Sequence, residues 1–334
     1  MTYTALFRHE RLRAAALAAL LVLPWHARCW GAGPAPGTAP TQELPGDISA
    51  EYERIFPEKT RAQGGTVPLQ LGEYRVLFVP GFLSNSSVAP ELLDKSPQMP
   101  KKPYFYSQIA WLRSNGIDAR IVDIRSESSV VDNAARVAES VRRSPGPVII
   151  VAHSKGGLDT LEALLAEPDL DAKVAGVITI QSPFKGTLIA DYVLENWLTT
   201  MWTALSILGG SELSLLDLTV DTRTRYQQDN AEGIAYLTAR VPFVSFGSWV
   251  DNDDGSMDTE NAMIRNFLLE HGMKNDGVVP TESALLPGAY TITAGTPDHN
   301  ATISESSRIP FDRIAFINTL FELLLARLPA GAIK

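Results

Sequence analysis

Residues 147–157 read PVIIVAHSKGG, and this stretch decides the fold. The run of β-branched residues predicts a buried strand. Small residues, Ala152 and Gly156, stand two positions before and two positions after Ser154. This spacing predicts a sharp strand-to-helix turn, because larger side chains there would collide with the strand and the helix. A serine at the tip lies at a helix N-terminus, where backbone amides favour negative charge. Ser154 is therefore a candidate nucleophile; the simpler alternative is a helix N-cap.

Strand and helix patterns alternate on both sides of this turn. Short runs rich in valine and isoleucine predict strands at residues 75–79, 119–124, 147–151, 174–180, 242–246 and 290–293. Amphipathic segments predict helices at residues 104–112, 130–141, 156–166, 261–269 and 312–327. Apolar strands separated by helices are typical of a parallel sheet that is covered on both faces. The predicted fold class is α/β, with a doubly wound, mostly parallel sheet.

The N-terminal region has a different composition. Residues 1–32 combine three early arginines with an apolar run at residues 14–24, which predicts a signal peptide and a secreted or periplasmic protein. The run is shorter than the roughly 20 residues of a membrane span, and a frayed amphipathic N-terminus is the alternative. Residues 33–48 are rich in proline, glycine and alanine, which predicts a linker. Residues 49–334 are then the folded domain.

Composition excludes several classes of protein. The chain has 334 residues, 38 acidic against 29 basic, and a net charge of -9. An acidic chain without a long basic run is not expected to bind nucleic acid. Cys29 is the single cysteine, so an intramolecular disulfide, a cysteine zinc site and a CxxC pair are excluded. No cofactor and no metal site are expected.

A serine hydroxyl needs a base to accept its proton. The chain has five histidines, and elimination favours His299, which lies in the loop after the last expected strand. The other four are less suitable because two belong to the predicted signal peptide, one adjoins the serine and one ends a helix: His9, His26, His153 and His271.

The base in turn needs a carboxylate that sets its tautomer. Asp276, in NDGVVP at residues 275–280, lies between the serine and the histidine in the chain. It gives the order Ser, Asp, His that is known for one class of serine hydrolases. Its competitors are Asp251, Asp253 and Asp254, which follow the strand at 242–246. An acidic cluster of that kind is commonly a solvated turn, and calcium binding is a further alternative.

Two backbone amides are needed to bind the developing oxyanion. The N–H of Lys155, directly after the nucleophile, is one expected donor. The N–H of Phe82 is the other, since Gly81 lets the turn after the first strand approach a substrate. The Lys155 side chain is expected to be a solvated surface lysine; attraction of an anionic substrate is the alternative.

The connection between the strands at 174–180 and 242–246 is far longer than an ordinary loop. Apolar residues repeat every four positions along it: Ile189, Val193, Trp197, Met201 and Leu205. Such a stripe predicts an amphipathic helix and, with the residues that follow, a helical cap inserted at about 186–240. Trp197, Met201 and Leu205 are the candidate substrate-binding or lid residues. A lid that opens on a lipid surface and a cap packed permanently on the core remain alternatives.

Together these motifs resemble the α/β-hydrolase fold and, within it, bacterial triacylglycerol lipases and esterases. The resemblance runs from about Tyr74 to the C-terminus and rests on six segments: VPGF (79–82), AHSKGG (152–157), QSPFKGT (181–187), SLLDLT (214–219), NDGVVP (275–280) and DHN (298–300). It implies the triad Ser154, Asp276 and His299, in agreement with the elimination. Pro80 departs from the usual His-Gly of the oxyanion turn.

Many such lipases carry a structural calcium, with an acidic ligand shortly after the catalytic histidine. Here Asn300, Ala301 and Thr302 follow the histidine, so the resemblance does not imply calcium for this chain. The expected function is an exported serine carboxylic ester hydrolase that acts through an acyl-enzyme on lipid or other apolar esters. The expected partners are the ester substrate and a lipid interface met by the cap, with no transmembrane span. Alternatives are a polyhydroxyalkanoate depolymerase, an acyltransferase, or a non-catalytic binding protein of the same fold.

Overall fold

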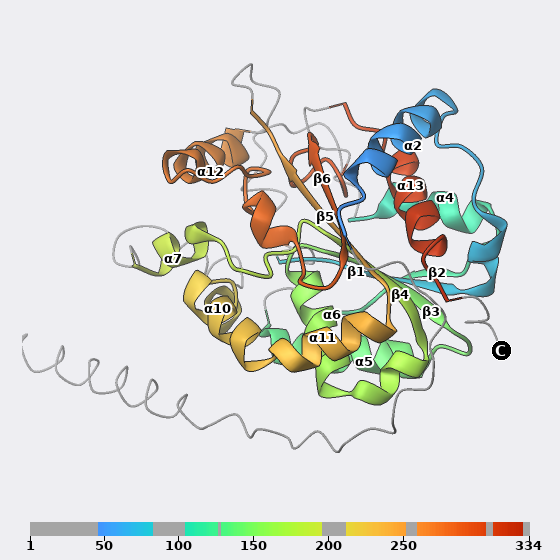
Figure 1. Cartoon of the computed structure of the whole chain (residues 1–334), viewed down its shortest axis with the longest axis horizontal. Helices are drawn as coiled ribbons and strands as arrows, with labels where there is room; N and C mark the ends of the chain where they lie inside the picture. Colours follow the sequence, from blue (N-terminus) through green and yellow to red (C-terminus); the bar gives the residue numbers. More distant parts are fainter. Residues whose placement is uncertain are drawn as a thin grey trace, which may run out of the picture. The chain divides into compact units, whose positions relative to one another are not determined.

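The computed structural model describes residues 46–82, 104–125, 128–195, 212–251, 259–304 and 310–329. They belong to one compact unit that spans residues 42–334 (Figure 1). The predicted signal peptide and nearly all of the predicted linker lie outside the described residues, so both stay predictions. No helix within the described ranges has the length and apolar character needed to cross a membrane.

The described residues form a six-stranded sheet in which every pair of neighbouring strands is parallel. The strands are β1 (Arg75–Val79), β2 (Ala119–Ile121), β3 (Val148–His153), β4 (Val174–Ile180), β5 (Phe243–Trp249) and β6 (Tyr290–Gly295). Their spatial order is β2-β1-β3-β4-β5-β6. The predicted α/β class with a doubly wound parallel sheet is therefore confirmed.

Strand β3 shows why the central strands are apolar at every position. Its residues Val148, Ile150 and Ala152 belong to one hydrophobic core, whereas Ile149 and Val151 belong to another. Successive side chains of a strand point to opposite faces, and here both faces are covered. An alternating polar pattern would leave polar groups buried, so the run stays hydrophobic.

Two helical layers cover the sheet (Figure 1). One face carries α5 (Val130–Arg142), α6 (Lys155–Ala166) and α11 (Ala231–Arg240). The opposite face carries α2 (Ser49–Arg61), α4 (Tyr106–Ser114) and α13 (Arg313–Leu325). Helix α2 was not among the predicted helices, because Pro57 interrupts its helical pattern. Its residues Tyr52 and Ile55 are nevertheless buried in the core on this face of the sheet.

The structure describes four helices within the range of the predicted cap insertion. They are α7 (Leu188–Glu195), α9 (Glu212–Leu216), α10 (Val220–Asp229) and α11. Helix α11 packs beside α6 in the connection between β4 and β5, with Ile234 and Leu237 buried in the core; the cap itself stays a prediction. Trp197, Met201 and Leu205 lie outside the described residues.

The remaining elements lie in the connections before and between the strands. They are the helix α12 (Thr259–Glu270) and the short 3₁₀ helices η1 (Leu69–Glu73), η2 (Pro168–Ala172) and η3 (Thr281–Ala284). Helix α12 and η3 flank the loop that contains Asp276, and the loop after β6 contains His299. Both loops therefore come late in the chain, and in the folded protein both lie next to the carboxyl end of β3.

Candidate active site

The turn between β3 and α6 is as sharp as its small residues predict. Ser154 stands between the two elements with φ 53° and ψ -131°, a conformation that costs energy for any residue other than glycine. A Cβ at Gly156 would lie 2.4 Å from the carbonyl oxygen of Val79, and one at Gly157 would lie 2.1 Å from Ser182 Oγ. Both contacts are shorter than packing permits, so the helix needs glycine at both positions to approach β1 and the turn after β4.

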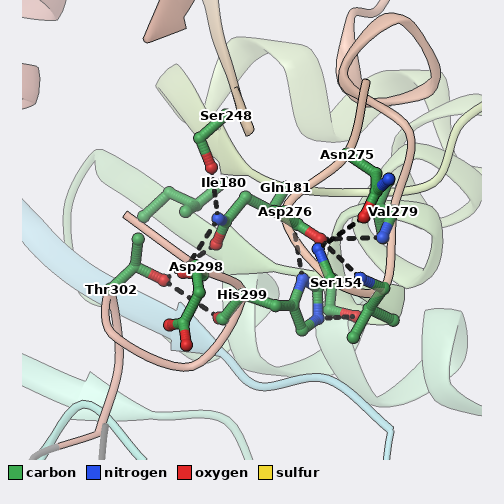
Figure 2. A network of polar contacts seen from close by, with 12 residues as sticks. Ser154, Ile180, Gln181, Ser248, Asn275, Asp276, Val279, Asp298, His299 and Thr302 are labelled. Carbon is green, nitrogen blue, oxygen red and sulfur yellow. Dashed lines mark hydrogen bonds and ion pairs between the residues drawn. The ribbon is translucent and has the colours of Figure 1, made fainter. Parts of the chain in front are cut away.

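Ser154, His299 and Asp276 come together at this turn (Figure 2). Ser154 Oγ lies 3.1 Å from Nε2 of His299, and Nδ1 of the same ring lies 2.9 Å from Asp276 Oδ2. Because an ionised carboxylate only accepts hydrogen bonds, Nδ1 carries the proton and Nε2 is free to accept one from the serine. The three residues are brought together although 145 positions separate the serine from the histidine.

The Asp276 carboxylate is buried and fully hydrogen-bonded. Its Oδ1 accepts from the backbone N–H groups of Val278 and Val279, at 2.9 and 2.8 Å, while Oδ2 accepts from His299. The backbone N–H of His299 also donates to the carbonyl of Asp276, at 3.0 Å. The side-chain and main-chain contacts together hold the imidazole against this one acid.

Asp251 is the one competing acid that the structure describes, and its environment differs from that of Asp276. Asp251 is exposed, and its Oδ2 accepts a hydrogen bond from the indole of Trp249 at 2.8 Å. Asp253 and Asp254 lie outside the described residues. Within the described part of the chain, no group of three or more histidine, cysteine or acidic residues is arranged to hold a metal ion.

Among the described residues, the rings of the two other histidines form no hydrogen bond with Ser154. His153 is buried, its Nε2 donates to the carbonyl oxygen of His299 at 3.0 Å, and the two rings lie 4.6 Å apart. Burial, together with the neighbouring His299, holds the pKa of His153 well below its usual value, so its ring is neutral. His271 is exposed at the end of α12, and His9 and His26 lie outside the described residues.

The turn after β1 lies directly against the serine. A Cβ at Gly81 would lie 2.8 Å from Ser154 Cβ and 3.3 Å from Ser154 Oγ. In the chain, Phe82 follows this glycine and Lys155 follows the serine; their roles as amide donors stay predictions.

The side chain of Lys155 contradicts both expectations for it. It is buried, and its Nζ forms an ion pair with Asp159 Oδ1 at 2.8 Å. Asn133 of α5 donates to the other oxygen of that carboxylate, at 3.2 Å. The lysine points into the contact between α5 and α6, because its position on α6 faces the helical layer. It is neither a solvated lysine nor an attractor for an anionic substrate.

Sequence reasoning missed the polar residues that support His299. Gln181 and Ser248 are fully buried and hydrogen-bonded to the loop of His299 or to each other (Figure 2). A signal was present, because Gln181 is a long polar residue directly after an apolar strand. The pattern of one segment does not show which distant backbone such a side chain meets.

No protein-family model matches the chain, and a search of the curated proteins finds no match. Solved structures do match. The metagenomic carboxyl esterase MGS0156 is 19% identical with a TM-score of 0.68, and the match covers 88% of this chain and 97% of the esterase. The mature form of the Bacillus licheniformis lipase BlEst2 is 23% identical with a TM-score of 0.56, and 78% of this chain and 93% of the lipase are covered.

At these identities the likeness concerns the arrangement of the backbone. The match to the esterase extends over nearly its whole length and includes the parallel sheet and its flanking helices. The chain therefore has the α/β-hydrolase fold that is found in these lipases and carboxyl esterases.

Proposed function

We propose that the protein is a serine hydrolase of carboxylic esters, with Ser154 as nucleophile, His299 as base and Asp276 as the acid that orients it. The observation that carries this proposal is the continuous hydrogen-bonded series from Ser154 Oγ through the imidazole to the buried carboxylate. The likeness to solved structures described as a lipase and a carboxyl esterase supports the reaction class.

In the proposed acylation step, Ser154 Oγ attacks the ester carbonyl while Nε2 of His299 takes the hydroxyl proton. The oxyanion that forms accepts hydrogen bonds from the backbone N–H groups of Phe82 and Lys155. When the tetrahedral intermediate collapses, His299 returns the proton to the departing alcohol. Water then attacks the acyl-enzyme with the same base, which releases the acid and restores Ser154.

The substrate of the proposed reaction is a lipid or another apolar ester. Trp197, Met201 and Leu205 would contact the acyl chain from the cap. The nearest described residues of the same stripe are Val193 and its neighbour Leu194, and both are partly buried against the core. This packing favours a fixed position for α7. A steep rise in rate above the solubility limit of a triglyceride would support an opening lid, and a flat response would support a fixed cap.

Export is the second part of this proposal. Residues 1–32 would direct the chain across a membrane and be removed. Mass spectrometry of the exported protein should then find an N-terminus between residues 27 and 33. An N-terminus at Met1 would contradict it.

The test of the catalytic proposal is Ser154→Ala. We expect kcat for a short p-nitrophenyl ester to fall about 10⁴- to 10⁶-fold, as for removal of a nucleophile from such a triad. Ser144→Ala is the control, because Ser144 is a buried serine that lies after α5, near the N-terminal end of β3. The assignment fails if Ser154→Ala keeps ordinary turnover while both variants are folded.

Covalent labelling separates a hydrolase from a non-catalytic protein of the same fold. A fluorophosphonate probe should modify Ser154 in the wild type and no serine in Ser154→Ala. Absence of labelling in the folded wild type would favour the binding protein. A depolymerase and an acyltransferase use the same triad, so a panel of simple esters, polyesters and acyl acceptors distinguishes those reactions.

A further inference from the structure

The loop that carries His299 is bound to the sheet through its backbone. Three consecutive carbonyl oxygens of the loop each accept a hydrogen bond from a different buried side chain. The pairs are Pro297 with Ser248 Oγ at 2.7 Å, Asp298 with Gln181 Nε2 at 3.1 Å, and His299 with His153 Nε2 at 3.0 Å.

The three donors come from the ends of neighbouring strands. His153 ends β3, Gln181 directly follows β4, and Ser248 is the sixth residue of β5. These strands are adjacent and parallel, so their carboxyl ends lie at one edge of the sheet. A surface loop is ordinarily more mobile than the elements it connects, whereas this one is bonded to three buried side chains at the ends of central strands.

Gln181 is the centre of this set (Figure 2). Its Nε2 donates both to the Asp298 carbonyl and to Ser248 Oγ, the latter at 2.7 Å, and its Oε1 accepts from Thr302 Oγ1 at 2.9 Å. One amide therefore binds the loop on both sides of His299. The residue is fully buried, so each of these groups would cost free energy without its partner.

The backbone of Gln181 is also held in an unusual state. Its φ is 52°, in the left-handed region that residues other than glycine seldom adopt. Its N–H donates to the carbonyl of Phe246 in β5 at 2.8 Å. A backbone conformation of high energy persists only where the surrounding structure imposes it. At Gln181 it occurs in a residue whose side chain forms three hydrogen bonds.

We propose that Gln181 is a positioning residue for His299, and this proposal rests on the proposed function above. The side-chain hydrogen bonds of Gln181 go to Ser248, Asp298 and Thr302, and not to Ser154 or the His299 ring. It fixes the backbone at Asp298 and Thr302, and thereby the distance between His299 Nε2 and Ser154 Oγ. A displacement of about 1 Å at such a contact lowers a reaction rate by as much as about 100-fold.

The test compares Gln181→Met with Thr179→Val. Methionine is similar in length but removes all three side-chain hydrogen bonds. Thr179 is the matched control, because it lies two residues earlier, is fully buried, and bonds Ser245 Oγ at 2.8 Å without meeting the loop. We expect Gln181→Met to lower kcat about 10- to 100-fold with KM within twofold, and Thr179→Val to leave both within twofold.

Two results would overturn the proposal: a kcat of Gln181→Met within twofold of the wild type, or equal losses of kcat in both variants that follow their losses of stability. If Gln181→Met does not fold, Ser248→Ala decides. It removes the donor to Pro297 and leaves Gln181 in place, so kcat should fall several-fold with KM unchanged. An unchanged kcat in Ser248→Ala would then overturn the proposal.

A readout without turnover separates this proposal from the proposed function. The low-field proton resonance of the His299 Nδ1–H group reports its hydrogen bond to Asp276 and is assigned by its loss in His299→Gln. We expect it to shift or broaden in Gln181→Met and to stay unchanged in Thr179→Val. A fully active Ser154→Ala variant would overturn the hydrolase assignment. An unchanged His299 resonance in Gln181→Met would overturn the positioning role of Gln181, whatever the result for Ser154→Ala.

Discussion

Two aspartates that follow β5 in the chain show how the environment gives the same side chain different chemistry. Asp276 is buried, accepts from two backbone amides, and meets the imidazole of His299. Asp251 is exposed and bonds an indole. A buried carboxylate whose oxygens are already directed by the backbone holds one ring in one tautomer, which an exposed carboxylate on a turn does not achieve.

The first prediction follows from this contrast. Asp276→Asn should lower kcat about 10³- to 10⁴-fold, because an amide in place of the carboxylate no longer selects the imidazole tautomer that accepts the serine proton. Asp251→Asn should stay within threefold of the wild type. Ester hydrolysis by both purified variants decides the matter. A nearly silent Asp276→Asn beside an inactive Asp251→Asn would transfer the role to Asp251.

At the scale of elements, the site depends on how closely α6 approaches β1. The first turn of α6 follows Ser154 directly, and Gly156 lies against the Val79 and Pro80 carbonyl groups at the end of β1. Those atoms are backbone, so they do not rotate away as a side chain would. The same close approach places the turn after β1 against the serine, since Gly81 follows these residues.

Gly156→Ala should therefore destabilise the fold. The new Cβ would lie 2.4 and 2.6 Å from two carbonyl oxygens, and overpacking of this kind costs about 1–3 kcal/mol or more. Gly146→Ala is the matched control, because nothing lies within 4 Å of a Cβ there, and it should change stability by less than about 0.5 kcal/mol. Urea unfolding measures both. Equal stability of the two variants would show that α6 can retreat from β1.

At the scale of the whole molecule, burial gives two titratable groups, His153 and Asp159, opposite effects on the pH dependence of stability. His153 is buried with its pKa well below the usual 6.5. In the helical layer, burial raises the pKa of Asp159 to about 7, against the opposing effect of Lys155. Each makes the free energy of unfolding depend on pH.

The sign for His153 follows from proton binding. Below about pH 6.5 the unfolded chain binds a proton at this residue and the folded protein does not, so stability decreases as pH falls. The contribution is at most about 1.4 kcal/mol per pH unit. Asp159 acts in the opposite direction, because the folded protein binds its proton at a higher pH than the unfolded chain does. The wild-type curve alone therefore does not isolate His153.

We expect His153→Gln to remove this contribution, since glutamine retains an N–H donor but does not titrate. Its unfolding free energy should fall less steeply between pH 6.5 and 5 than that of the wild type. Urea unfolding at several pH values measures the difference, with the exposed His271→Gln variant as control for loss of a histidine. Identical slopes in the wild type and His153→Gln would contradict the prediction.

Much of this architecture was predictable from local patterns. The bounds of β1 and β4 agree with the predicted strands, because both are short apolar runs between turn residues. Helix α11 was not separable from the predicted insertion, since its apolar residues fit a cap as well as a crossover. Helix α2 packs against α13 from the far end of the chain, a contact that no local pattern contains.

By itself, the sequence determined the parallel α/β sheet and the sharp turn at Ser154, and it favoured His299 among five histidines as the candidate base. Those features depend on periodicity, on small residues at fixed spacing and on chain order, which are local properties. Only the tertiary structure decided that Asp276 and not Asp251 meets His299, that Lys155 is buried against Asp159, and that Gln181 bonds the loop of His299. Each of these contacts depends on which groups, distant in the chain, are buried next to one another. A buried polar side chain stabilises the fold when it has a hydrogen-bond partner and costs free energy when it has none.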